Sequence, residues 1–320
     1  MAVYTEVPAP ALTAFLADYE LGAPMALEGI TEGVENSNFR LATERGRYIL
    51  TIYEKRVDVA DLPFFLGLME HLARHGLPCP LPVHGRDGQA LRRLQGKPAA
   101  IVSLLEGRWP RRITVERCGA LGEALATLHA ATADFGMTRV NALSFDGWRS
   151  LFAGCGDRAD SVEPGLAAEI AADLADLARL WPKDLPQGVI HADLFPDNVF
   201  FDGDRITGII DFYFACNDLL AYDVAICINA WCFELDGSFN LTKARALLHG
   251  YRRRRSLSPA EVAALPVLAR GAALRFLMTR LYDWLHQIEG AMVKPKDPRE
   301  YLRKLRFHRA VADPAAYGLA

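Results

Sequence analysis

The sequence predicts an α+β fold, in which a small antiparallel sheet is followed by a mainly helical region. Residues 25–30, 37–43 and 48–54 alternate apolar and polar side chains, as strands with one buried face do. From Thr114 onward, apolar residues recur every three or four positions, which is the spacing of amphipathic helices. Residues 189–212 gather carboxylate and amide side chains around a predicted β-hairpin.

Length and composition indicate a globular protein of one large or two moderate domains, and a fold with two lobes fits that length. The chain has 320 residues, of which 51% are hydrophobic and 23% charged, and its net charge is −3. We therefore expect no nucleic-acid partner and no attraction to anionic membranes. No run of about 18 apolar residues predicts a membrane span. The start of the chain does not resemble a secretion signal, so we expect a cytoplasmic location.

The six cysteines are scattered and include no C-x-x-C pair. This spacing predicts neither a zinc site nor a disulfide framework. Oligomeric state is not predicted by any feature of the sequence.

The first part of the chain is predicted to form a small lobe built on a sheet, over residues 1–102. A helix is expected over residues 10–19, before the three strands, and a second helix over 59–76, where Gly76 ends it. Three further strands, over residues 81–83, 90–94 and 98–104, complete the predicted sheet.

A helical lobe is predicted over residues 108–320. Thr114 can cap a helix that extends to His129. A second helix is expected over residues 166–180. The segment from Ser258 to Glu261 combines a capping box with proline at the first helical position, which predicts a helix start. The last long helix is predicted over residues 274–288.

The segment with the most chemical information begins at His191. His191, Asp193 and Asn198 fit H-x-D-x-x-x-x-N, the catalytic-loop pattern of kinases, and Asp211 occupies the position of their metal-binding Asp. Two apolar runs around residues 202–205 predict a hairpin that brings Asn198 toward Asp211. Oxygen ligands of this kind suit Mg²⁺. Asp193 is then the predicted base for the acceptor hydroxyl, and His191 is expected to shape the loop.

This segment resembles the aminoglycoside phosphotransferase and choline kinase group of kinase-like enzymes, because Ala192 follows His191 where protein kinases have arginine. Within that group, residues 33–39 resemble the homoserine kinases. The resemblance implies a bilobal protein-kinase-like fold and the cofactors ATP and Mg²⁺. It also implies ATP-dependent phosphorylation of a small hydroxylated metabolite, for which L-homoserine is the expected substrate.

The resemblance also implies a nucleotide site, with a turn that covers the phosphates and a hinge over residues 103–107. The expected contacts are Gly33, Val34, Asn36, Ser37, Asn38, Thr51, Ser103 and Leu105. Thr51 occupies the strand position that is usually basic, and Lys55 follows on the same face of the strand. The acidic partner of the usual lysine would fall near Phe65. Loss of both charges avoids leaving one buried charge without its partner.

Two further roles are expected from the helical lobe. Asp223, in a segment that resembles the group's D-[LV]-A sequence, would accept hydrogen bonds from the catalytic-loop backbone. Arg280, Asp283 and Trp284 lie on one flank of the predicted helix over residues 274–288. Together with Asp193, they are the predicted substrate contacts, because homoserine carries both a carboxylate and an ammonium group.

Two alternative functions differ from this prediction in ways the sequence can address. An aminoglycoside phosphotransferase needs a surplus of acidic residues for a polycationic substrate, but residues 274–289 offer two acids against two arginines. A nucleotide-binding pseudokinase scaffold would not need Asp193, Asn198 and Asp211, which are all present.

Overall fold

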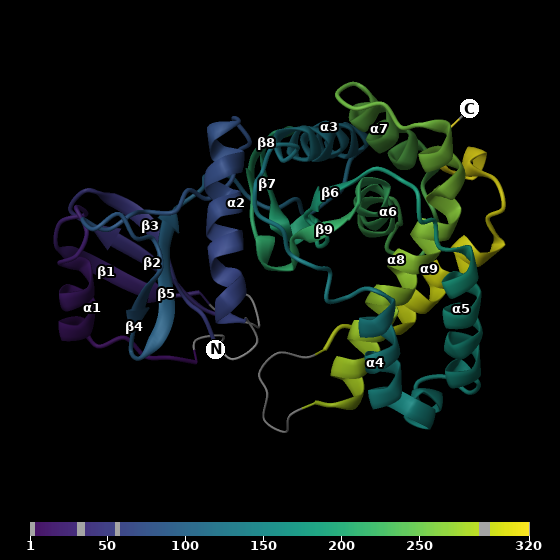
Figure 1. Cartoon of the computed structure of the whole chain (residues 1–320), viewed down its shortest axis with the longest axis horizontal. Coiled ribbons are helices and arrows are strands. Elements are labelled where there is room, and N and C mark those ends of the chain that lie inside the picture. The colour runs from purple at the N-terminus through teal and green to yellow at the C-terminus, as the bar shows by residue number, and fades with distance from the viewer. Residues whose placement is uncertain (1–3, 31–35, 55–57, 288–294, 320) are drawn as a thin grey trace. The chain divides into compact units, whose positions relative to one another are not determined.

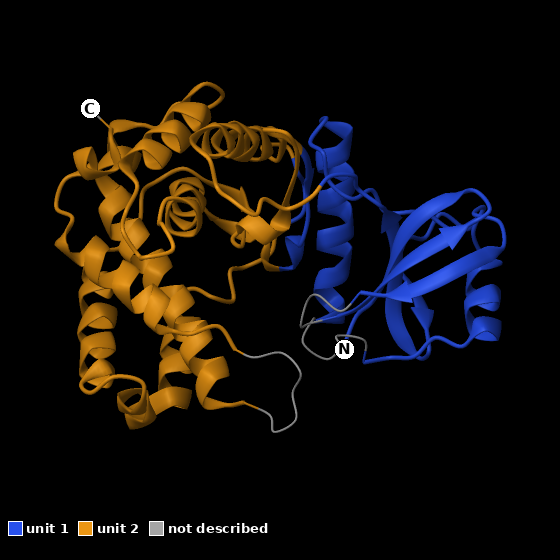
Figure 2. Cartoon of the chain, turned by 180° about the vertical axis from the view of Figure 1, so that it is seen from behind, with its two compact units in different colours: residues 1–107, 135–137, 207–213 blue, residues 108–134, 138–206, 214–320 orange. Residues whose placement is uncertain are grey.

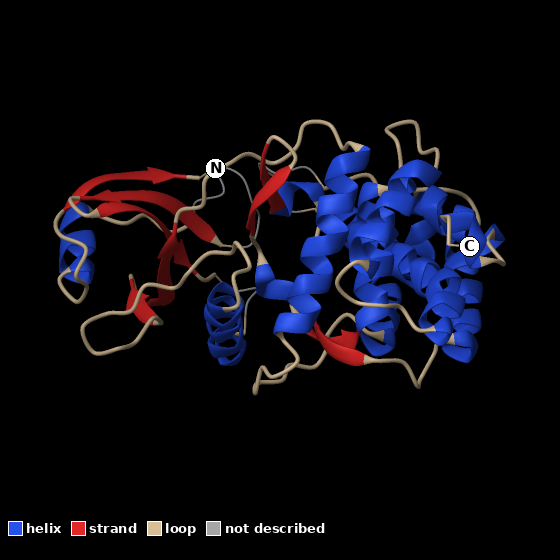
Figure 3. Cartoon of the chain, turned by 90° about the horizontal axis from the view of Figure 1, so that it is seen from above, coloured by secondary structure: helices blue, strands red, loops and turns tan. Residues whose placement is uncertain are grey.

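The computed structural model describes residues 4–30, 36–54, 58–287 and 295–319. The chain divides into two compact units, which Figure 2 colours separately. Unit 1 comprises Met1–Gly107, Phe135–Met137 and Thr207–Tyr213, and unit 2 comprises Arg108–Asp134, Thr138–Ile206 and Phe214–Ala320. Unit 1 holds the larger sheet and unit 2 is mainly helical (Figure 3). The predicted α+β class is confirmed, whereas the roles predicted for the two lobes and the hinge stay predictions.

The sheet of unit 1 has five strands in the order β1-β2-β3-β5-β4, and all of its pairings are antiparallel (Figure 1). The strands are β1 (Pro24–Gly29), β2 (Ser37–Thr43), β3 (Gly46–Ile52), β4 (Arg92–Leu94) and β5 (Lys97–Ser103). The strand predicted over residues 81–83 is wrong, because only an isolated bridge between Pro82 and Val102 forms there. Pro82 has no N–H to donate to a strand ladder.

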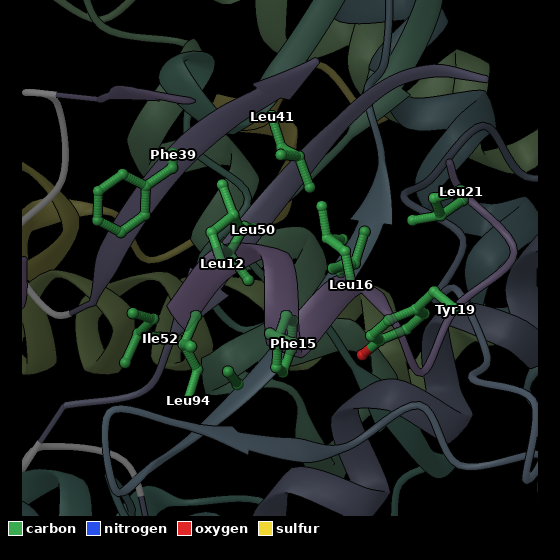
Figure 4. Packing of buried hydrophobic residues seen from close by; sticks show 12 residues of the cluster. Leu12, Phe15, Leu16, Tyr19, Leu21, Phe39, Leu41, Leu50, Ile52 and Leu94 are labelled. Atoms are coloured by element: carbon green, nitrogen blue, oxygen red, sulfur yellow. The ribbon is translucent and has the colours of Figure 1, made fainter. Parts of the chain in front are cut away.

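The core of unit 1 lies between helix α1 (Ala9–Leu16) and one face of this sheet (Figure 4). Phe39 lies directly opposite Leu50 in the β2–β3 ladder, so both side chains point to this face. Leu50 and Ile52 are fully buried. The cluster comprises Leu12, Phe15, Leu16, Tyr19, Leu21, Phe39, Leu41, Leu50, Ile52, Leu94, Ala99 and Ile101.

The opposite face of the sheet carries the residues predicted to lie near a nucleotide. Asn38 of β2 is the direct ladder partner of Thr51 in β3, and Thr51 is in turn opposite Ala100 of β5. Successive residues alternate between faces, so Asn38 and Thr51 point away from the core around α1. Helix α2 (Leu62–Arg74) also belongs to this unit, and Gly76 follows it with a φ of 81°.

Unit 2 contains helices α3 (Val115–Ala131), α4 (Phe145–Cys155), α5 (Leu166–Leu180), α6 (Leu220–Trp231), α7 (Leu241–Arg252), α8 (Pro259–Leu285) and α9 (Arg299–Ala310). Two short sheets pair β6 (Gln187–Ile190) with β9 (Cys216–Leu219), and β7 (Val199–Asp202) with β8 (Arg205–Ile209), which continues into unit 1. Thr114 caps α3 by accepting a hydrogen bond from the Arg117 N–H, as predicted. Short 3₁₀ helices span Val59–Asp61, Gly156–Ser161, Pro196–Asn198, Phe212–Phe214 and Pro314–Tyr317.

Helix α8 is longer than the sequence predicted. It runs without a break from the Ser258 capping box to Leu285, so the start expected at residue 274 is wrong. Its residues are buried on several sides between Leu265 and Leu281, and such a helix has no single apolar stripe that marks where it begins. It is long and apolar enough to cross a membrane by length and composition alone, but 67% of its most apolar window is buried inside the protein. It therefore has the character of a core helix.

Ion pairs connect α5, α8 and α9. The buried Asp173 of α5 accepts a hydrogen bond from Nε of Arg270 in α8 at 2.7 Å and one from Nε of Arg309 in α9 at 3.3 Å. Nearby, Arg306 donates to Glu169 of α5 at 2.6 Å. A buried carboxylate needs such partners to offset its lost hydration.

Candidate active site

The predicted catalytic loop begins directly after β6, and its backbone is held by a buried carboxylate. Asp223, near the start of α6, accepts hydrogen bonds from the N–H groups of His191 at 2.7 Å and Ala192 at 3.0 Å. This is the contact expected of Asp223. Ala192 has a φ of 63°, a left-handed conformation that costs energy for a residue with a Cβ. The Arg275 guanidinium also donates to the Ala192 carbonyl oxygen, so the strained peptide is held from both sides.

Asp223 belongs to a buried polar chain. His129 Nε2 lies 3.2 Å from Asp223 Oδ2, and His129 Nδ1 lies 2.8 Å from the Tyr251 hydroxyl. Burial opposes the charged form of Asp223, but His129 and His191 outweigh this effect and hold the pKa of Asp223 below its ordinary value. His129 is thus structural, and Asp223 is a carboxylate that orients the loop.

Asp193 and Asn198 are joined within the loop. Asn198 Nδ2 donates to the Asp193 carbonyl oxygen at 2.8 Å and lies 3.4 Å from Asp193 Oδ2. Because these contacts use the amide nitrogen, Oδ1 of Asn198 is the atom that can act as a metal ligand. The Asp193 N–H donates to His191 Nδ1 at 3.3 Å. His191 thus contacts the backbone of its own loop, and its shaping role stays a prediction.

Asp211 follows β8 and has a φ of 65°, again a left-handed conformation in a residue other than glycine. Strained residues of this kind occur often at functional sites. Asp211 belongs to unit 1, whereas Asp193 and Asn198 belong to unit 2. A metal site shared by Asn198 and Asp211 therefore stays a prediction.

The residues next to the predicted phosphate turn are engaged in the sheet. The Thr51 hydroxyl donates to Asn38 Oδ1 at 2.8 Å, and Asn36 Oδ1 accepts from the Glu54 N–H at 3.2 Å. The Ser37 hydroxyl donates to Glu54 Oε1 at 2.7 Å. Gly33, Val34 and Lys55 lie outside the described residues. Contact of this turn with phosphates stays a prediction.

An ion pair that the sequence analysis missed anchors the same corner of unit 1. Lys97, at the start of β5, pairs with Glu54 and also donates to the Thr5 hydroxyl at 2.7 Å. Although burial raises the pKa of Glu54, its hydrogen bonds with Lys97, Thr5 and Ser37 lower it further, so the net shift is downward. The pair joins residues 43 positions apart, which local patterns do not reveal.

The predicted hinge begins where β5 ends. The Ser103 hydroxyl accepts a hydrogen bond from the Leu81 N–H at 2.9 Å, and the Glu106 carbonyl accepts one from the Thr207 hydroxyl at 2.7 Å. Leu105 lies between them, partly buried. Adenine contacts at Ser103 and Leu105 stay predictions.

An aromatic cluster occupies the place where the lysine and its acidic partner were expected. Tyr213, two residues after Asp211, donates to the Tyr53 hydroxyl at 3.3 Å, and its hydroxyl lies within reach of the Thr51 hydroxyl. Its ring lies 5.6 Å from that of Tyr53 and 5.6 Å from that of Phe65, both nearly perpendicular. Uncharged groups therefore occupy this position.

Of the predicted substrate residues, Arg280 has the most buried environment. Its Nη1 atom lies 2.6 Å from Glu300 Oε2, and Glu300 Oε1 lies 2.7 Å from Lys304 Nζ. Burial raises the pKa of Glu300, but Lys304 and Arg280 outweigh this and lower it to about 2. Asp283 is exposed and Trp284 is partly buried near the end of α8.

Arg280, Glu300 and Lys304 line a pocket in unit 2 next to the catalytic loop. Its volume is about 250 Å³, and its lining residues are Trp109, Pro110, Phe195, Pro196, Asp197, Ala230, Arg280, Lys296, Glu300 and Lys304. Basic side chains outnumber acidic ones three to two. Asp283 and Trp284 are not among the lining residues. The α9 members were missed because the sequence analysis predicted no helix there.

The two-unit α+β fold and the loop around Asp193 define a phosphotransferase of the kinase-like type. The chain belongs to the phosphotransferase enzyme family, whose sequence model matches residues 26–257.

Known proteins resemble the chain over its full length. A homoserine kinase of Parvibaculum lavamentivorans is 63% identical over 319 residues, which cover 100% of this chain and 99% of the relative. A homoserine kinase of Rhodospirillum rubrum is 62% identical over 320 residues, which cover both chains completely. Among solved structures, an amicoumacin kinase in complex with AMP-PNP and Ca²⁺ has a TM-score of 0.71 and 16% identity, covering 97% of this chain and 92% of the other. That structure shows the shared fold.

Proposed function

We propose that this protein is an ATP-dependent kinase that phosphorylates the hydroxyl group of L-homoserine to give O-phospho-L-homoserine. The observation that carries the proposal is the full-length identity of more than 60% with proteins named homoserine kinase. A cytoplasmic location suits such a metabolic enzyme. Neither a nucleic acid nor a membrane is part of the proposal.

The catalytic role falls to Asp193. Its carboxylate accepts the proton of the homoserine hydroxyl and directs the oxygen toward the γ-phosphorus. Positioning of this kind is the main contribution that a protein makes to phosphoryl transfer. Asp223 and Arg275 support it by fixing the loop peptide at Ala192.

Asn198 and Asp211 are the proposed ligands of Mg²⁺, because an amide oxygen and a carboxylate fit a hard cation. When bound, ATP supplies the γ-phosphoryl group and Mg²⁺ neutralises its charge. The backbone around Gly33, Val34, Asn36, Ser37 and Asn38 is the proposed phosphate contact, and the backbone of Ser103 and Leu105 the adenine contact.

The pocket beside the catalytic loop is the proposed homoserine site. Arg280 and Lys304 would bind the carboxylate, and Glu300 the ammonium group, since a zwitterion needs partners of both signs. Glu300 thereby takes the role that the sequence analysis gave to Asp283. Asp283 and Trp284, near the end of α8, are proposed to border the substrate from outside the pocket.

The aminoglycoside alternative is disfavoured by the charge of this pocket. A polycationic drug requires more acidic than basic groups, whereas Arg280, Lys296 and Lys304 exceed Asp197 and Glu300. Binding a polycation next to the three basic side chains would bring like charges together, which costs free energy.

The proposal is tested by measuring ADP release with homoserine, methylthioribose, choline and kanamycin, and by mass spectrometry of each product. We expect O-phosphohomoserine and little or no turnover of the other three compounds. Phosphorylation of kanamycin or methylthioribose without O-phosphohomoserine would overturn the choice of substrate. Absence of turnover with all four compounds would overturn the proposed kinase activity on this set.

A further inference from the structure

Among the described residues of unit 1, the two positions of the usual lysine–glutamate pair are uncharged, as the sequence analysis expected. Thr51 stands at the basic strand position, and Phe65 is near the expected acidic position on α2. Thr51 and Phe65 are 3% and 1% exposed, so both side chains are buried. The connection between them must therefore be made by uncharged contacts.

A continuous set of contacts runs from β2 to the residues after Asp211. Asn38 Oδ1 accepts a hydrogen bond from the Thr51 hydroxyl at 2.8 Å, the Thr51 hydroxyl lies within reach of that of Tyr213, and Tyr213 donates to the Tyr53 hydroxyl at 3.3 Å. The perpendicular ring contact of Tyr213 with Phe65 continues the set to α2. We call Asn38, Thr51, Tyr53 and Tyr213 the hydroxyl network.

The hydroxyl network joins the segments that a kinase must keep in register. Asn38 lies three residues after the undescribed phosphate turn, and Thr51 is its ladder partner. Tyr213 is two residues from Asp211, and all these residues belong to unit 1. The network thus connects the end of the phosphate turn to the proposed metal ligand through side chains of one compact unit.

The conformation of Asp211 indicates why such a connection is needed. A φ of 65° is unfavourable for aspartate, and surrounding contacts must maintain it. Tyr213 lies in the single 3₁₀ turn Phe212–Phe214 that directly follows Asp211, and Phe212 of this turn is buried. Its hydroxyl and ring together fix the direction in which the chain leaves Asp211.

We propose that the hydroxyl network replaces the usual lysine–glutamate pair, and that Tyr213 is a positioning residue that sets the Asp211 carboxylate relative to strands β2 and β3. This inference rests on the proposed function of Asp211 as a metal ligand. It assigns Tyr213 no contact with the substrate. Its effect on turnover passes through Asp211.

The test uses Tyr213→Phe in the full-length protein, because phenylalanine keeps the ring contacts with Tyr53 and Phe65 and removes only the hydroxyl. We expect kcat to fall about five- to tenfold and the Mg²⁺ concentration for half-maximal rate to rise at least about threefold. The KM for homoserine should stay unchanged. The melting temperature should stay within about 2 °C, since one partly exposed hydroxyl is lost.

Two further variants locate the effect. Thr51→Val removes the neighbouring hydroxyl, and the double variant should be no worse than the poorer single variant, because both changes break the same connection. Tyr48→Phe is the matched control. Tyr48 lies on β3, the strand of Thr51, and packs against the core around α1, outside the network. The kinetics of the Tyr48→Phe variant should therefore be unchanged.

Asp211→Ala separates the two levels of the proposal. If Asp211→Ala abolishes turnover but Tyr213→Phe retains the wild-type kcat and Mg²⁺ dependence, the positioning role of Tyr213 is wrong and the proposed function stands. If Tyr213→Phe lowers only the melting temperature, its role is structural and the inference also fails. If Asp211→Ala turns over normally, the metal assignment itself is wrong.

Discussion

The side chain of Asn198 donates to the carbonyl oxygen of Asp193 at 2.8 Å, so the proposed base and the proposed metal ligand share one fixed piece of backbone. A proton acceptor and a metal ligand held in this way need little rearrangement when substrates bind. Such preorganisation favours phosphoryl transfer.

The role of Asp193 is tested with Asp193→Asn. Asparagine keeps the shape of the side chain but cannot accept the hydroxyl proton, so we expect kcat to fall at least about 100-fold. Affinity for ATP, measured by calorimetry, should change little. A kcat within a few fold of the wild-type value would show that Asp193 is not the base.

The metal assignment is tested with Asp211→Ala and Asn198→Ala. Loss of the Asp211 carboxylate leaves phosphate charge uncompensated, so Mg²⁺-dependent turnover should disappear and MgATP should bind more weakly. Asn198→Ala should have a milder effect, because a neutral ligand is lost. Unchanged rate and calorimetric affinity in Asp211→Ala would contradict the assignment.

Thr51 departs from the usual basic residue, and its contribution should be small. We expect Thr51→Ala to cost less than about 1.5 kcal/mol in kcat/KM, as befits a neutral hydrogen bond. Steady-state kinetics of Lys55→Ala provide the comparison, since Lys55 is the nearest alternative cation in the sequence. A much larger loss in Thr51→Ala would mean that the hydroxyl contacts a reactant.

The substrate pocket is tested with Arg280→Ala. Removal of the guanidinium takes away one of the two proposed partners of the homoserine carboxylate, so KM for homoserine should rise at least about tenfold while KM for ATP changes little. Arg303→Ala, an exposed position on α9, serves as the control and should leave both values unchanged. Equal rises in both KM values for Arg280→Ala would indicate a general structural effect.

The pH dependence of stability should reveal the pairing of Glu300. Its pKa is lowered from 4.5 to about 2, chiefly by Lys304 and Arg280 acting against burial. The ionised form is therefore favoured by folding, and its contribution to stability is present above the ordinary pKa and is lost as pH falls toward 2. Denaturant unfolding of wild type and Glu300→Gln should differ most near neutral pH and converge in acid. A difference that grew as pH fell would contradict this pairing.

The sequence predicted α5 with its observed boundaries because its apolar residues follow one clear stripe, from Leu166 to Leu177. It missed α9, where Glu300, Lys304 and Arg306 interrupt the apolar residues. Those charges have partners on α5, α8 and within α9, and the pairings appear only when the helices pack. From hydrophobic periodicity alone, such a segment is predicted to be exposed to solvent rather than packed as a helix.

The residues of the candidate site also fall into two groups, those that local sequence spacing predicts and those that only tertiary contacts reveal. The motif from His191 to Asp211 is contained within 21 residues, so spacing was enough to identify its members. Arg280 was chosen from its helix flank, but Glu300 lies 20 positions away on a separate helix. Tyr213 is two residues from the recognised Asp211, yet its partner Tyr53 is 160 positions away in the sequence. Long-range pairings of this kind are set by tertiary structure.

Helix α8 carries Arg270, Arg275 and Arg280 at intervals of five residues. Five residues rotate a helix by about 140° beyond one full turn, so the three side chains leave it in different directions. They reach Asp173, the carbonyl of Ala192 and Glu300 respectively.

Helix α8 thus pairs with a neighbouring helix, holds the catalytic loop and lines the pocket. A substitution that shifts the helix would affect all three of these contacts together. At Gly271 a Cβ atom would clash with the Trp181 ring, so even an alanine at this position would displace helix α8 or Trp181. Changes in substrate range are therefore more accessible through α9 and the Trp109 segment than through α8, whose Arg275 also holds the loop peptide.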